Sequence, residues 1–206
     1  MGFTVMSNSF KDGDYLPSDF ILSADFGFGC AGGNKSPHLK WSDSPPGTKS
    51  FAVTCYDPDA PTGSGFWHWL VVNIPANVSE LPEGAGSAGG NLPAGAVQTR
   101  TDFGTPGYGG PCPPQGDHPH RYLFTVFAVK TDRLDVKPDT SLPRSWASIC
   151  ISIPWRRQRS WGCSKGEDGD RAGHHRHRLE RPATAWLGMN HTRTGWQTAC
   201  CTAEFR

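Results

Sequence analysis

The chain has 206 residues, a length typical of one domain or of one domain with an appendage. Its formal net charge of +1 gives no reason to expect nucleic acid as a partner. No apolar stretch approaches the length of a membrane span, and the first residues lack the pattern of a secretory signal. We therefore expect a cytoplasmic protein. The 25 glycines and 18 prolines favour a turn-rich β protein over a helical one.

Four segments have the composition of β-strands, namely residues 50–57, 67–74, 97–103 and 121–130. The last of them is almost continuously apolar, which suits a strand that is buried on both faces. Long loops rich in glycine and proline separate the segments, and long ordered loops on a β scaffold usually carry function. This pattern predicts an all-β fold, an antiparallel β-sandwich.

A proline-stiffened acidic turn follows the first of these strands. In "DPDAP", Pro58 and Pro61 fix φ at two points and restrict the residues before them. The carboxylates of Asp57 and Asp59 therefore have little conformational freedom. The next strand carries His68, which the alternation of a strand can aim inward.

A second histidine, His120, begins the last predicted strand, and Tyr122 lies on the same face because it is two residues further on. If the strands are neighbours, these side chains meet His68 and a carboxylate in a small polar cavity. A carboxylate beside a histidine favours the imidazolium, which could donate hydrogen bonds to a phosphate or a carboxylate. The same residues also fit an ordinary turn with capping carboxylates and packed histidines.

The segments "YDPDAPTGSGFWHWLVVNIP" and "HRYLFTVFAV" resemble the phosphatidylethanolamine-binding protein family, in its bacterial and archaeal Raf kinase inhibitor-like branch. The resemblance runs through residues 7–141 in order. It implies an antiparallel β-sandwich with short peripheral helices and a small anion-binding pocket at one end. It also implies a binding protein that is not an enzyme, needs no cofactor or metal, and takes phosphate or phospholipid head groups.

The family's pocket residues can be placed on this sequence one by one. The resemblance assigns the acidic wall, the pocket histidines, a loop proline and the tyrosine of the "HRY" element to Asp57, Asp59, Pro61, His68, Pro114, His120 and Tyr122. Arg121 points to the other face of its strand, so we expect a structural role for it. Eukaryotic members regulate kinases and other partners, and a homodimer is compatible with the resemblance.

Two other functions remain open. A protein-interaction regulator, such as a kinase or protease inhibitor, could use the same pocket. A metal-dependent hydrolase is a further alternative, because two aspartates and two histidines could hold a metal. Their local spacing matches no standard metal signature.

The stretch 101–104, "TDFG", resembles the kinase magnesium motif, but the motifs that should accompany it are missing.

Three cysteines lie in the first part of the chain. Cys30 and Cys112 both occur in glycine-rich loops, and secreted relatives carry cysteines in similar positions, where a disulfide would be reasonable. For a chain without a signal peptide we expect two reduced thiols. Cys55 lies inside a predicted strand and is expected to be a buried apolar residue.

The composition changes near residue 141. Fourteen of the 15 phenylalanines and tyrosines and every valine precede residue 142, whereas ten of 13 arginines and five of eight tryptophans follow it. We therefore treat 1–141 as the family-like domain and 142–206 as a separate tail. Arginine-rich tails with little apolar periodicity are usually disordered. The tail's "GHHRHR" and "ACC" fit no standard zinc finger.

A one-base slip of the reading frame near Ser141 could explain this tail. With suitable synonymous codons, the bases that encode the next 21 residues read in the shifted frame as "PAAELGFNLHFHTLAKATLLG", which resembles the family's C-terminal segment. On this hypothesis the domain lacks its native last helix and strand. We then expect an uncovered sheet edge near the pocket and a weakened or aggregation-prone domain.

Overall fold

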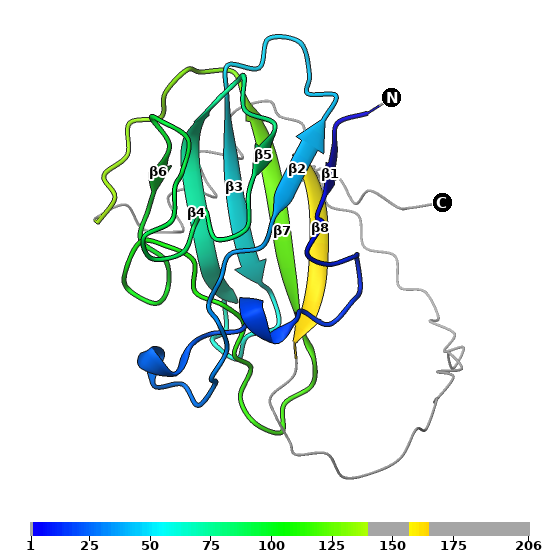
Figure 1. Cartoon of the computed structure of the whole chain (residues 1–206), viewed down its shortest axis with the longest axis vertical. Helices are drawn as coiled ribbons and strands as arrows, with labels where there is room; N and C mark the ends of the chain where they lie inside the picture. The colour runs from blue at the N-terminus through cyan, green and yellow to red at the C-terminus, as the bar shows by residue number, and fades with distance from the viewer. Residues whose placement is uncertain (1, 140–156, 165–206) are drawn as a thin grey trace, which may run out of the picture. The chain divides into compact units, whose positions relative to one another are not determined.

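The computed structural model describes residues 2–139 and the backbone of residues 157–164. In this part of the chain all strands pair antiparallel and form two sheets (Figure 1). The smaller sheet has the order β1-β2-β5 and contains β1 (Thr4–Met6), β2 (Leu39–Ser42) and β5 (Glu80–Leu81). The larger sheet has the order β6-β4-β3-β7-β8 and contains β3 (Ser50–Asp57), β4 (Phe66–Pro75), β6 (Val97–Gln98), β7 (His120–Val129) and β8 (Arg157–Ser164).

The predicted antiparallel β-sandwich is confirmed. Short 3-10 helices, Ser18–Phe20 and Ala24–Phe26, are the helices in the described residues. No helix in residues 2–139 or 157–164 has the length and apolar character needed to cross a bilayer.

The main core lies between the two sheets. Alternate residues of β3, β4 and β7 point into it, and Trp69 and Phe124 are fully buried there. Leu39 and Trp41 of β2 and Leu81 of β5 approach from the smaller sheet. The two-residue period of a strand therefore explains why one face of each central strand is apolar.

The other face of the larger sheet is also buried. Leu70 and Val72 of β4 pack there against Leu134, which belongs to the segment after β7. Asn73 holds this segment, because its side chain accepts a hydrogen bond from the Leu134 amide (2.7 Å) and donates one to the Leu134 carbonyl (3.1 Å). Burial on both faces accounts for the nearly continuous apolar runs of the central strands.

The prediction for residues 97–103 is wrong in its length. Only Val97–Gln98 forms a strand, β6. The chain then turns, because the Thr101 amide donates to the Thr105 carbonyl (3.0 Å) and Gly104 adopts a φ of 90°. A positive φ of this size favours glycine, so the turn is encoded by Gly104.

Part of the arginine-rich tail belongs to the larger sheet. The strand β8 pairs with β7 from His120↔Ser164 to Phe127↔Arg157. We expected an uncovered sheet edge near the pocket, but β8 covers the edge of β7 over this stretch. The remainder of residues 142–206, with the "GHHRHR" and "ACC" segments, lies outside the described residues, and its disorder stays a prediction.

We propose that the tail arises from a one-base slip near the Ser141 codon. The abrupt change of composition at this point supports the proposal. Sequencing of the encoding DNA is expected to show that a one-base shift there restores the family-like ending. If none does, the slip is refuted, and β8 belongs to the chain's native design.

Candidate functional site

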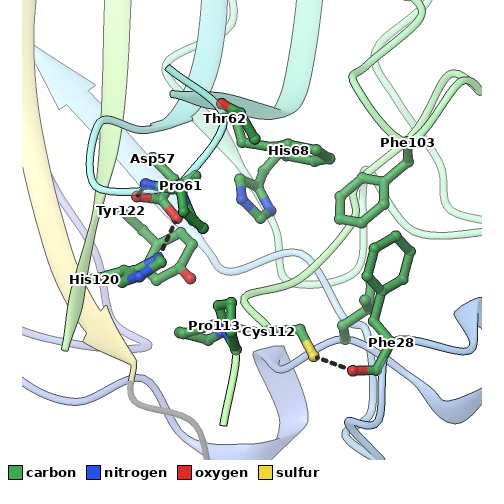
Figure 2. A pocket seen from close by; sticks show the side chains of 14 residues that line it. Phe28, Asp57, Pro61, Thr62, His68, Phe103, Cys112, Pro113, His120 and Tyr122 are labelled. Atoms are coloured by element: carbon green, nitrogen blue, oxygen red, sulfur yellow. Dashed lines mark hydrogen bonds and ion pairs between the residues drawn. The ribbon is translucent and has the colours of Figure 1, made fainter. Parts of the chain in front are cut away.

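A cavity of about 200 Å³ lies where the end of β3 meets the beginnings of β4 and β7 (Figure 2). The antiparallel pairing of Asp57 with Phe66 brings the first two of these strand ends together. The cavity is lined by Leu22, Phe28, Asp57, Ala60, Pro61, Thr62, Phe66, His68, Phe103, Cys112, Pro113, Pro114, His120 and Tyr122. Six of the seven residues that the sequence assigned to a pocket thus meet at this cavity, and Asp59 does not line it.

Asp57 is a buried carboxylate with several partners. Its Oδ1 accepts hydrogen bonds from the amides of Asp59 (2.8 Å) and Ala60 (3.1 Å), which belong to the proline-stiffened turn. Its Oδ2 lies 2.8 Å from Nδ1 of His120, and only 1% of the His120 side chain is exposed. The turn therefore fixes the carboxylate, and the carboxylate fixes the orientation of the His120 ring.

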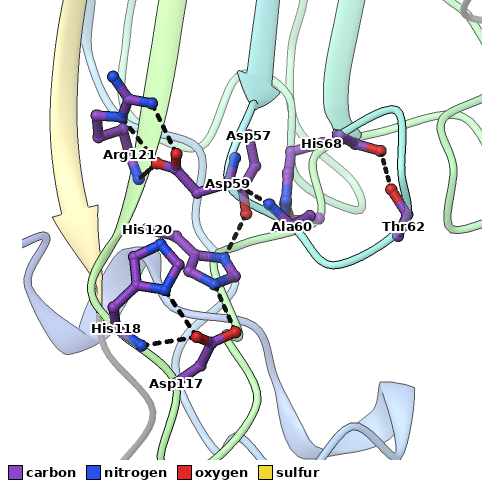
Figure 3. A network of polar contacts seen from close by, with 11 residues as sticks. Asp57, Asp59, Ala60, Thr62, His68, Asp117, His118, His120 and Arg121 are labelled. Atoms are coloured by element: carbon purple, nitrogen blue, oxygen red, sulfur yellow. Dashed lines mark hydrogen bonds and ion pairs between the residues drawn. The ribbon is translucent and has the colours of Figure 1, made fainter.

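Sequence analysis missed Asp117, which contacts the other nitrogen of the same ring (Figure 3). Its Oδ2 lies 3.2 Å from Nε2 of His120, and its Oδ1 lies 2.7 Å from Nδ1 of His118. The amide of His118 donates a further hydrogen bond to Asp117, and this bond is the main reason why the pKa of Asp117 is lowered. The stretch "DHPH" was the available signal, since it places an acid and two histidines within four residues.

His68 enters the cavity from β4. Its Nδ1 lies 2.8 Å from the carbonyl oxygen of Gly109, which can only accept, so Nδ1 carries a proton and Nε2 is left for a ligand. Burial lowers the pKa of His68, and the Gly109 bond and the charge of Asp57 offset this only in part. Asp57 thus favours the imidazolium of His68, as expected, but burial outweighs this effect and the pKa is lowered overall.

Tyr122 forms part of the cavity wall and lies beside His120 (Figure 2). Its ring packs edge-on against His68, with 5.1 Å between the ring centroids. Burial raises the pKa of Tyr122, and the charge of Asp57 adds to this effect. The hydroxyl group therefore keeps its proton and can donate a hydrogen bond.

Asp59 faces away from the cavity toward Arg121. Its Oδ2 accepts hydrogen bonds from the Arg121 amide and Nε, and its Oδ1 accepts one from Nη2, at distances of 2.7–2.8 Å (Figure 3). The side-chain hydrogen bonds with Arg121 lower the pKa of Asp59 to about 2. This pair fastens the acidic turn to β7, which agrees with the structural role expected for Arg121.

Aromatic rings make up the opposite wall. Phe103 contacts Phe28, Phe66 and His68 edge-on, with ring centroids 4.8–5.8 Å apart. These phenylalanines come from three distant parts of the chain, so local sequence patterns did not reveal them. Phe103 belongs to the "TDFG" stretch, whose likeness to a kinase motif has no structural counterpart here.

The expectation of two reduced thiols is wrong, because Cys30 and Cys112 form a disulfide. Their loops lie together, since the Leu22 amide donates to the Pro111 carbonyl (3.0 Å) and the Tyr108 hydroxyl to the Phe20 carbonyl (2.9 Å). The bond joins residues 82 positions apart and places Cys112 in the cavity wall. Cys55 is buried and free, as expected.

Comparison with known proteins agrees with this architecture. UPF0098 protein YbcL of Escherichia coli (strain K12) is 59% identical over 140 residues, which make up 68% of this chain and 75% of that protein. UPF0098 protein YbhB of the same organism is 55% identical over 137 residues, 66% of this chain and 84% of that protein.

The crystal structure of E. coli YbcL, presented as a new member of the mammalian PEBP family, matches with a TM-score of 0.76 and 49% identity. The match covers 81% of this chain and 100% of the YbcL chain. The family model for phosphatidylethanolamine-binding proteins matches residues 6–147. The chain therefore belongs to the phosphatidylethanolamine-binding protein family.

Proposed function

We propose that the protein is a non-enzymatic, Raf kinase inhibitor-like binding protein whose cavity takes phosphate or a phosphorylated head group. The observation that carries the proposal is the arrangement of His68. Its Nδ1 is engaged by Gly109, so Nε2 can serve a ligand beside the protonated hydroxyl of Tyr122. The Tyr122 hydroxyl is a donor, and Nε2 becomes one when a bound anion favours the imidazolium. In an otherwise largely apolar cavity these groups suit a small anion, because few water molecules compete for them.

The negative charge of Asp57 in the cavity wall is compatible with anion binding. It accepts two main-chain hydrogen bonds and contacts His120, so its charge is compensated locally. Asp57 then acts on the anion indirectly, by fixing the His120 ring as part of the cavity wall. Pro61 and Pro114 complete the wall and restrict its movement.

The cavity side chains support binding rather than nucleophilic catalysis. Among the lining residues, Cys112 is held in the disulfide, and Thr62 and Tyr122 are the hydroxyl-bearing side chains. The Thr62 hydroxyl donates to the Gly65 carbonyl, and the Tyr122 hydroxyl interacts with the Asp57 carboxylate, so neither contact is with a histidine that could act as a base. We therefore propose that the anion is held and released unchanged.

Removal of the two histidines is expected to weaken phosphate binding. In an NMR titration with inorganic phosphate, the wild-type protein should show saturable shifts for residues around the cavity, and His68→Ala and His120→Ala should reduce the affinity at least about tenfold. His68→Asn is the sharper variant, because its amide can replace the Nδ1 donor to Gly109 while removing Nε2. Unchanged affinity in all three variants would refute the assignment.

Phosphate affinity is expected to fall as the pH rises. Burial keeps the pKa of free His68 below its ordinary value of about 6.5, whereas a bound anion favours the imidazolium. Binding therefore takes up a proton, and the affinity decreases with rising pH from the pKa of the free protein upward. His68→Asn serves as the control, since phosphate itself titrates equally in both measurements. A pH profile shared by both proteins would contradict this prediction.

The alternative of a protein-interaction regulator has one specific observation in its favour. Phe28 is 61% exposed although it lines the cavity, so a partner protein could cover it while reaching the pocket. A partner captured by the wild-type protein and lost with both Phe28→Ser and His68→Asn would favour regulation over simple ligand binding.

The disulfide bears on the compartment in which the protein acts. Disulfides persist in oxidising environments and are rare in the cytosol. The Cys30–Cys112 bond therefore argues against the cytoplasmic location predicted from sequence, and we propose that the protein acts in an oxidising compartment.

A further inference from the structure

Three side chains of the types that can bind metals lie together on the loop that leads into β7. A carboxylate oxygen of Asp117 and ring nitrogens of His118 and His120 all lie within 4.8 Å of one another. Figure 3 shows the two rings side by side above the Asp117 carboxylate. His118 and Asp117 do not line the anion cavity, so this cluster forms a separate group that shares only His120 with it.

The surroundings of His120 are those of a metal ligand. A histidine that binds a metal almost always donates its other ring N–H to a carboxylate, a carbonyl or water. The Nδ1 of His120 has such a partner, the buried Oδ2 of Asp57 at 2.8 Å, and two main-chain amides fix that carboxylate. This contact directs Nε2 toward Asp117. A cation between Nε2 and the Asp117 carboxylate would take the place of the proton that joins them.

The donor set selects the class of cation. Two imidazoles and one carboxylate suit zinc and similar first-row ions, whereas calcium and magnesium prefer oxygen ligands. Metal–ligand bonds of about 2.1 Å place the ligand atoms of a tetrahedral site about 3.4 Å apart. The distance from Oδ2 of Asp117 to Nε2 of His120 is 3.2 Å, near this value, whereas His118 contacts the other oxygen, Oδ1, at 2.7 Å. One ligand atom from each residue lies within 4.8 Å of the others, and the exposed His118 ring can adjust to a common ion.

We propose that Asp117, His118 and His120 form a binding site for a divalent zinc-type cation, with Asp57 as the residue that positions His120. Three protein ligands leave a coordination position open. The cation adds positive charge next to the cavity and strengthens phosphate binding there. That coupling rests on the proposed function, whereas the cation site itself does not.

The test is an NMR titration of the full chain with Co²⁺ in the absence of phosphate. His174, His175 and His177 are replaced by alanine in every sample, because "HHRH" is a second potential chelator. Signals of residues 117–122 are expected to respond first and saturably. His118→Ala and Asp117→Asn should each weaken this binding at least about tenfold.

His38→Ala, at a histidine remote from the cluster, is the matched control and should leave the Co²⁺ affinity unchanged. Equal Co²⁺ affinity with and without His118, or no response of residues 117–122, would overturn the proposal. Phosphate titration of His118→Ala in the presence of a chelator measures the anion cavity independently. Failure of the cation site is thereby distinguished from failure of the proposed function.

Discussion

Loss of the Cys30–Cys112 disulfide is expected to lower the free energy of unfolding by several kcal/mol. The bond closes a loop with a sequence separation of 82 residues. For such a loop the chain-entropy model gives about 4.5 kcal/mol, and measured losses are typically about 2–5 kcal/mol. Because domains are stable by only about 5–15 kcal/mol, this is a large fraction of the total. The double variant Cys30→Ser/Cys112→Ser, followed by urea unfolding, provides the measurement.

The same variant is expected to bind phosphate more weakly. Cys112 lines the cavity, and the bond holds its loop against the loop that carries Phe28. A reductant should lower both the free energy of unfolding and the phosphate affinity of the wild-type protein. It should change neither quantity in the double variant. If the free energy of unfolding of the double variant lies within about 0.5 kcal/mol of that of the oxidised wild type, other contacts already hold the two loops together.

Trp69→Ala is expected to cost about 3–5 kcal/mol of folding free energy. The Trp69 side chain is fully buried between the sheets, and its Nε1 donates to the Gln98 side chain at 2.6 Å. Gly86 packs so closely against the indole that a methyl group there would overlap with it. Truncation therefore removes buried apolar surface, leaves a cavity and removes the hydrogen-bond partner of Gln98.

Tyr15→Ala is the matched control for an aromatic truncation, because Tyr15 is 57% exposed. This substitution should change the free energy of unfolding by no more than about 0.5 kcal/mol. Chemical denaturation of both variants gives the comparison, with folding checked by near-ultraviolet circular dichroism. Similar losses for the two variants would contradict the packing described for Trp69.

The central strands could be predicted from sequence because each is long and apolar. Ser50–Asp57 has the predicted bounds, and β4 and β7 differ from their predictions by one residue at each end. The strands of the smaller sheet have two to four residues and were missed, since so short a segment shows little periodicity. Their strand character depends on pairing between distant segments.

The candidate site was only partly predictable for a related reason. Strand alternation and the proline-rich turn were enough to predict that Asp57, His68, His120 and Tyr122 face a pocket, because their orientation depends on local geometry. Phe28 and the disulfide depend on the approach of loops about 80 residues apart, which no local pattern encodes. The sequence shows two acids in the turn but not which one faces inward. In the structure Asp57 lines the cavity and Asp59 contacts Arg121.

The protonation state of His68 is the most direct test that the cavity binds an anion. The ¹⁵N chemical shifts of its two ring nitrogens can be followed at neutral pH while inorganic phosphate is added. Phosphate is expected to convert Nε2 from the unprotonated to the protonated form, while Nδ1 keeps its proton and its hydrogen bond to Gly109. Unchanged Nε2 shifts at phosphate concentrations that saturate the amide signals would contradict the account.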